Sequence, residues 1–245
     1  MEIDVKRYFI GIFFVSVATL ALQVGVIRYF SIALWSNYGY MAISIALFGF
    51  GMSGTLLTLS RGWVEKRLPN LMYIISLLFI PVAVYAYILM KKIPFNALQI
   101  VDPSSTFSQM GNLGLYFIVL FFPFFLSGLY IGIAFLAHKK EVEKLYFYDL
   151  IGAGVGAIAI LILMFFIHPD YLFVPITIFF FLGHIFSIDI GETSKFKSIK
   201  MFLTAIVFAL FMVIILFNSK INYSVYKDIT HTKASIGYEL RLEKY

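Results

Sequence analysis

Long runs of apolar residues, separated by short polar stretches, make up the chain from residue 8 to residue 218. A helix needs roughly 20 apolar residues to cross the ~30 Å of hydrocarbon in a bilayer. Seven runs come close to or exceed this length, and each predicts one membrane-spanning helix. The predicted spans are Tyr8–Ile27, Tyr40–Leu59, Leu71–Met90, Leu113–Ala137, Leu150–Ile167, Tyr171–Ile188 and Met201–Asn218.

These spans predict an all-α fold for residues 1–218, a polytopic transmembrane helical bundle. Pro81 and Pro123 lie inside the third and fourth spans. A proline removes one helical hydrogen bond and its ring clashes with the preceding turn, so we expect a kink at each position.

Residues 219–245 differ from the rest of the chain. Tyr238, Leu240 and Leu242 alternate there with charged side chains, which is the pattern of a half-buried strand. A lone strand cannot pair its backbone. We therefore expect a short extramembrane tail with strand character, which docks on another chain or leads into a soluble domain that is missing here; a frayed end is the alternative.

Composition supports a membrane location. The chain is 61% hydrophobic and 13% charged, with a mean hydropathy of +0.92. A soluble domain is about half apolar and about a quarter charged. The lipid bilayer is therefore the expected partner of a multi-pass protein of the cell membrane. The absence of cysteine excludes disulfides and thiolate metal sites, and we expect no metal and no cofactor.

The net charge of +6 comes from basic residues in the segments between spans. If the N-terminus is cytoplasmic, the inner segments hold eleven Lys and Arg residues and the outer loops before the tail hold three. This bias is typical of membrane topology and predicts a cytoplasmic N-terminus, with the tail on the outer side after seven spans. No basic and aromatic groove predicts a nucleic-acid partner.

Glycines four residues apart predict where helices pack closely. Gly152 and Gly156 form such a face on the fifth span, and Gly128 and Gly132 form one on the fourth. We expect these two faces to pack on each other. The second span carries Gly49, Gly51 and Gly54, for which close packing is the first interpretation and an unwound transporter segment the second.

Few ionisable residues lie near the spans. Asp149 is expected to cap the fifth span, and a role of Asp149 or Glu141 in ligand binding is the alternative. Arg28 ends the first span and is expected to reach the lipid headgroups, with Asp102 as a possible partner. No acid falls inside a predicted span, which argues against a proton-coupled pump.

His168 and His184 flank the sixth span. At about 1.5 Å per residue their separation of sixteen residues corresponds to roughly 24 Å, too far for one haem. We expect both histidines at the membrane interface. No Ser–His–Asp set, HExxH or Walker motif occurs, so we expect no catalytic activity from this chain alone.

Several stretches carry a family resemblance. The sequence LSGLYIGIAF, a short charged loop and KLYFYDLIGAGVGAI resemble the membrane half of spermidine-synthase-like multispanning membrane proteins, and residues 21–28 and 43–54 resemble that family's first two helices. The resemblance covers nearly the whole chain. It implies a membrane domain that anchors, or supplies a lipophilic or amine substrate to, a separate or missing Rossmann-like transferase domain. The implied partner is a soluble transferase subunit or a second copy of the chain.

The alternative is a small-solute transporter or flippase. Such a protein would use the glycines of the second span and the two proline kinks around a central cavity.

Overall fold

The computed structural model describes residues 2–34, 36–100, 103–187 and 194–218. Within these ranges the chain is helical and contains no strand, which confirms the all-α prediction. The elements in chain order are α1 Glu2–Ala33, η1 Ser36–Tyr38, α2 Gly39–Leu59, α3 Arg61–Val64, α4 Leu68–Lys92, η2 Ala97–Ile100, α5 Thr106–Ala137, η3 Lys139–Glu141, α6 Val142–Phe166, η4 Pro169–Tyr171, α7 Phe173–Ser187 and α8 Ser194–Phe217.

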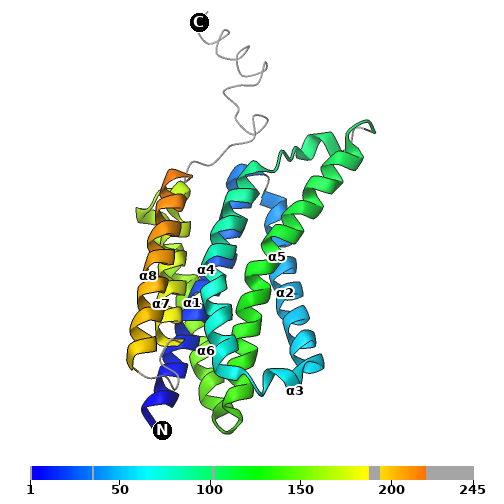
Figure 1. Cartoon of the computed structure of the whole chain (residues 1–245). Helices are drawn as coiled ribbons and strands as arrows, with labels where there is room; N and C mark the ends of the chain where they lie inside the picture. The colour runs from blue at the N-terminus through cyan, green and yellow to red at the C-terminus, as the bar shows by residue number, and fades with distance from the viewer. Residues whose placement is uncertain (1, 35, 101–102, 188–193, 219–245) are drawn as a thin grey trace, which may run out of the picture.

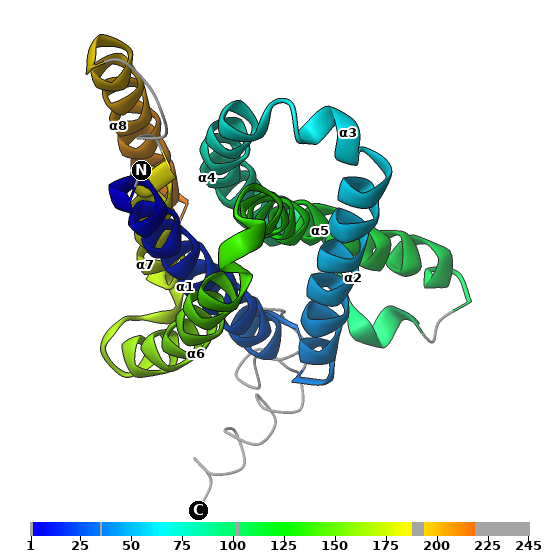
Figure 2. The same ribbon diagram turned by 90° about the horizontal axis from the view of Figure 1, so that it is seen from below.

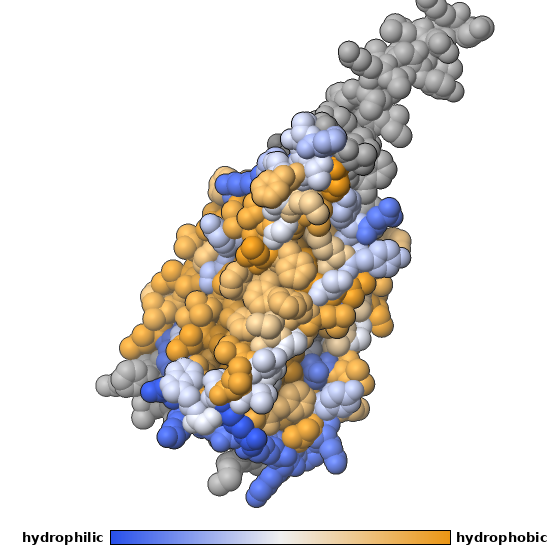
Figure 3. Space-filling model, turned by 90° about the vertical axis from the view of Figure 1, so that its right-hand side faces the viewer, coloured by the Kyte–Doolittle hydropathy of each residue, from blue (hydrophilic) through white to orange (hydrophobic). Residues whose placement is uncertain are grey.

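Six of these helices are long and apolar enough to cross a membrane, namely α1, α2, α4, α5, α6 and α8. The sixth predicted span, Tyr171–Ile188, corresponds to α7, which is apolar but has 15 residues. Together with the shorter α7, these helices run alternately up and down, so that the N-terminus and the end of α8 lie at opposite ends of the bundle (Figure 1). An apolar belt covers the face in Figure 3, and hydrophilic side chains gather at its lower end. The transmembrane bundle is the architecture of the protein.

Helix α1 lies at the centre of the packing. It packs against α6 and α7, while α5 packs against α2 and α4, and α4 also meets α7 (Figure 2). A helix that is apolar on all sides is suited to such a central position. Ile12, Ala18 and Val26 of α1 are fully buried. In contrast, α6 and α8 lie at the edge and expose much of their apolar surface to lipid.

The predicted pairing of the two glycine faces is wrong, because each face packs on a different helix. Gly152 and Gly156 of α6 face α1, where an added Cβ would lie 2.5 Å from the Phe13 carbonyl oxygen or collide with that of Val17. The glycines permit close approach, as predicted, but to a backbone that is distant in sequence.

The glycines of α5 face α2 instead. An added Cβ would collide with Ser53 Oγ at Gly128 and with Leu57 Cδ1 at Gly132. On α2 itself, Gly49 packs against the backbone of α5, with an added Cβ 2.9 Å from the amide nitrogen of Phe125.

The other two α2 glycines have a different environment. Gly51 and Gly54 are exposed, and an added Cβ would meet nothing within 4 Å at either position. Close packing therefore accounts for Gly49 and does not account for Gly51 and Gly54.

Several helices extend beyond the predicted span ends, and two of these extensions change the place of a charged residue. The fifth predicted span starts at Leu150, but α6 starts at Val142, so Asp149 lies inside the helix and does not cap it. Arg28 does not end α1, which continues to Ala33. The prolines also lie within continuous helices, Pro81 in α4 and Pro123 in α5.

Two predictions fall on residues outside the described ranges. The tail with strand character covers residues 219–245, and the proposed partner of Arg28 is Asp102. Arg28 itself has an exposed side chain. Both predictions stay open.

The α1–α6 contact can be tested at one glycine. Gly156→Leu places a side chain where the Val17 backbone lies, and we expect it to lower the free energy of unfolding by about 3 kcal/mol. Gly154→Leu is the matched control, because an added Cβ there meets nothing within 4 Å. Thermal unfolding of both variants in the same detergent measures the difference; equal losses would contradict the packing described.

Candidate functional site

A buried histidine joins three helices near the end of the bundle that carries the N-terminus. His184 of α7 is fully buried. Its Nδ1 lies 2.6 Å from Ser76 Oγ of α4, and its Nε2 lies 3.0 Å from Thr204 Oγ1 of α8. Both hydroxyl groups are themselves buried. Polar groups inside a membrane bundle are costly unless they are hydrogen-bonded, so this arrangement marks a candidate site.

Two further side chains complete this polar cluster, which consists of Tyr73, Ser76, His184, Lys200 and Thr204. The Tyr73 ring centroid lies 5.4 Å from that of His184. The Lys200 ammonium lies 4.5 Å from the centre of the Tyr73 ring, in a cation–π contact. The cluster therefore has one cationic edge.

We expected His184 at the membrane interface. In the structure α4 and α8 cover its side chain, so His184 is enclosed by helices near the end of α7. The available signal was the presence of isolated hydroxyl residues, Ser76 and Thr204, in two otherwise apolar runs. Periodicity alone does not show that these residues meet a histidine.

A second polar contact joins α1 to α6. Ser16 Oγ donates a hydrogen bond of 2.5 Å to the Asp149 carboxylate. Ser16 is buried and Asp149 is partly buried. Asp149 lies one residue before the predicted span Leu150–Ile167, within the longer helical stretch 139–166 that is apolar enough to cross a membrane. The carboxylate positions α6 on α1 together with the glycine contacts.

A buried lysine lies at the opposite end of the bundle. Lys91 of α4 donates hydrogen bonds to the backbone carbonyl of Asn218, just after α8, and to the Tyr87 hydroxyl at 3.1 Å. A cation next to the last carbonyls of a helix satisfies these acceptors and favours the negative end of the helix dipole. Lys91 thus holds the end of α8 against α4.

Ion pairs connect the loops at the N-terminal end of the bundle. Glu65 accepts from Lys139 at 2.7 Å and from Arg61 at 3.0 Å, and these contacts hold the pKa of the Glu65 carboxyl below its usual value. Glu141 pairs with Lys144 at 2.7 Å and makes no side-chain cap to α6. Exposed pairs of this kind contribute little stability, and Glu141 shows no feature of a ligand site.

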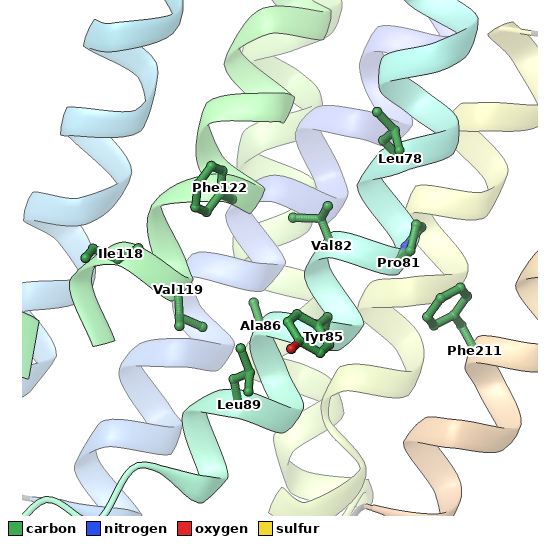
Figure 4. Close-up of a pocket in the computed structure, with 10 residues that line it drawn as sticks. All are labelled: Leu78, Pro81, Val82, Tyr85, Ala86, Leu89, Ile118, Val119, Phe122 and Phe211. Atoms are coloured by element: carbon green, nitrogen blue, oxygen red, sulfur yellow. The ribbon is translucent and has the colours of Figure 1, made fainter. Parts of the chain in front are cut away.

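An apolar groove opens toward lipid between α4, α5 and α8 (Figure 4). Its volume is about 590 Å³, within the range of small-molecule sites. Pro81 lies at its wall, near the middle of α4. The residues that line it are Leu78, Pro81, Val82, Tyr85, Ala86, Leu89, Ile118, Val119, Phe122 and Phe211.

The described residues contain no group of three or more His, Cys, Asp or Glu side chains that could hold a metal ion. The chemistry available is therefore hydrogen bonding at the polar cluster, one carboxylate at Asp149, and apolar binding in the groove.

No family model, no curated protein and no solved structure matches the chain. The resemblance to spermidine-synthase-like membrane proteins stays a prediction, and function is inferred from the chain's own residues.

The Ser16–Asp149 bond predicts a measurable loss. Ser16→Ala leaves the partly buried carboxylate without this donor and is expected to lower the free energy of unfolding by about 1–2 kcal/mol. Thr19→Val is the control, because Thr19 bonds only to the Val15 carbonyl of its own helix. Chemical unfolding in mixed micelles compares the two. A Ser16→Ala protein as stable as the parent would show that the bond contributes nothing.

Proposed function

We propose that the chain is the membrane module of a spermidine-synthase-like transferase system, which takes a hydrocarbon-bearing molecule from the bilayer and presents it to a soluble transferase. The observation that carries this proposal is the apolar groove of about 590 Å³ between α4, α5 and α8. A lipid-facing hollow of this size suits an acyl or isoprenoid chain.

The lining of the groove favours a lipophilic substrate over a free amine. No lining residue is charged, and the Tyr85 hydroxyl is the polar group among them. A polyamine would need carboxylates to offset the loss of its hydration. Asp149 of α6 pairs with Ser16 at the α1–α6 contact and is not among the groove residues.

The groove lies nearer to one end of α4 than to the other. It begins at Leu78, ten residues or about 15 Å after the start of α4 at Leu68, and it ends at Leu89, three residues or about 5 Å before Lys92. A lipid chain in the groove is therefore expected to have its headgroup near Lys92, at the end of the bundle opposite the N-terminus.

A photoactivatable phospholipid with a diazirine in its acyl chain tests this proposal in reconstituted vesicles. We expect it to label peptides of α4 and α5 that line the groove. Val82→Trp fills the groove and is expected to reduce this labelling at least about fivefold. Ile158→Trp on the lipid-facing side of α6, where Ile158 is 60% exposed, is the control and is expected to change nothing.

Labelling spread evenly over all lipid-facing helices, or unchanged in Val82→Trp, would contradict lipid binding in the groove. Transferase activity of the purified chain alone, assayed with a nucleoside-linked sulfonium donor, would contradict the role of a module that serves a separate transferase.

Transport of a small solute is the second candidate, and the partly buried Asp149 favours it because acids inside spans are common in transport pathways. Under this alternative, Asp149→Asn would reduce uptake of labelled solute into vesicles about tenfold or more, while Val82→Trp would not. Under the proposed function no uptake occurs in either protein, and the lipid labelling depends on Val82.

A further inference from the structure

The polar cluster contains four hydrogen bonds arranged in two chains that meet at His184. On one side Ser76 Oγ lies 2.6 Å from Nδ1 and 3.0 Å from the Tyr73 carbonyl oxygen. On the other side Thr204 Oγ1 lies 3.0 Å from Nε2 and 2.7 Å from the Lys200 carbonyl oxygen. Each hydroxyl group therefore lies between a ring nitrogen and a backbone carbonyl.

A neutral imidazole cannot use all four bonds at once. It has one N–H donor and one bare nitrogen, and each hydroxyl has one hydrogen to donate. If Nε2 carries the hydrogen, Ser76 must donate to Nδ1 and loses its bond to the Tyr73 carbonyl. If Nδ1 carries it, Thr204 must donate to Nε2 and loses its bond to the Lys200 carbonyl.

An imidazolium uses all four. Both ring N–H groups donate to hydroxyl oxygens, and both hydroxyls donate onward to carbonyl oxygens. Hydrogen bonds from a charged donor are also stronger than neutral ones. We propose that His184 is a reversible proton-binding site between α4, α7 and α8, with Ser76 and Thr204 as positioning residues. Proton binding at His184 goes beyond the proposed function and does not depend on it.

Two effects oppose the charge. Burial disfavours an imidazolium, and the Lys200 ammonium adds a like charge next to Tyr73. Helices α4, α7 and α8 contain no Asp or Glu in their sequences. From α1, the residues that meet the neighbouring Gly183 are Gly11 and Val15, which do not titrate. The hydrogen bonds of the imidazolium must therefore offset the cost of burying its charge.

Nitrogen-15 NMR of the full chain, labelled at histidine and held in lipid nanodiscs, tests the proposal. The chain has four histidines, and His184→Gln identifies the signal of interest. We expect the His184 ring to change from a neutral to a doubly protonated form as the pH is lowered within the range in which the protein stays folded.

Three variants move the midpoint of this change in different directions. Ser76→Ala and Thr204→Val each remove an acceptor of a ring N–H, and each is expected to lower the midpoint by about one pH unit. Lys200→Gln removes the nearby cation and is expected to raise it by about half a unit. Lys200 is partly exposed, so this variant is expected to keep its fold even if the two hydroxyl variants do not.

A His184 signal that stays neutral at every pH at which the protein is folded would overturn the proposal. A midpoint that is the same in the parent, in Ser76→Ala and in Thr204→Val would also overturn it, because the imidazolium would then not depend on the two hydroxyl groups that accept from its ring N–H groups.

Discussion

The close approach of α1 to its neighbours is the contact on which the rest of the structure depends. In hydrocarbon the hydrophobic effect does not drive helices together, so van der Waals packing between backbones must do so. Gly152 and Gly156 bring α6 onto the carbonyls of α1, and Gly183 brings α7 onto Val15. Because α6 and α7 both pack on α1, α1 forms the core of the bundle.

The position of α1 determines where the polar side chains of its neighbours lie. Because α6 approaches α1 so closely, Asp149 lies within reach of Ser16. Because α7 packs on α1 and also meets α4, His184 is placed between Ser76 and Thr204, away from lipid. The groove, in contrast, lies where α4, α5 and the peripheral α8 leave apolar side chains without a partner helix. Polar groups inside the bundle and an apolar hollow at its surface follow from one packing arrangement.

The sequence predicted the helices well and their partners poorly. Apolar runs of about 20 residues have few structures open to them in a bilayer, so six spans were found, together with the shorter α7. Gly128 and Gly156 were correctly predicted to lie at helix–helix contacts. A face of small residues can pack on any helix, so the sequence does not show which helix is the neighbour. Asp149 was predicted to cap its helix, because an acidic residue just before an apolar run is typical of an N-cap. The helix α6 already starts at Val142. His184 was missed because its burial comes from α8, which is distant in sequence.

Disulfide cross-linking tests the central position of α1 most directly, since the chain contains no cysteine of its own. The pair Ser16→Cys and Asp149→Cys joins α1 to α6 at two side chains that are in contact, so it is expected to form a disulfide in native membranes under mild oxidation. The pair Phe125→Cys and Val155→Cys, three residues from Gly128 and Gly152 on the same helix faces, reports the alternative α5–α6 pairing and is expected to stay reduced. Cross-linking of the second pair without the first would contradict the account.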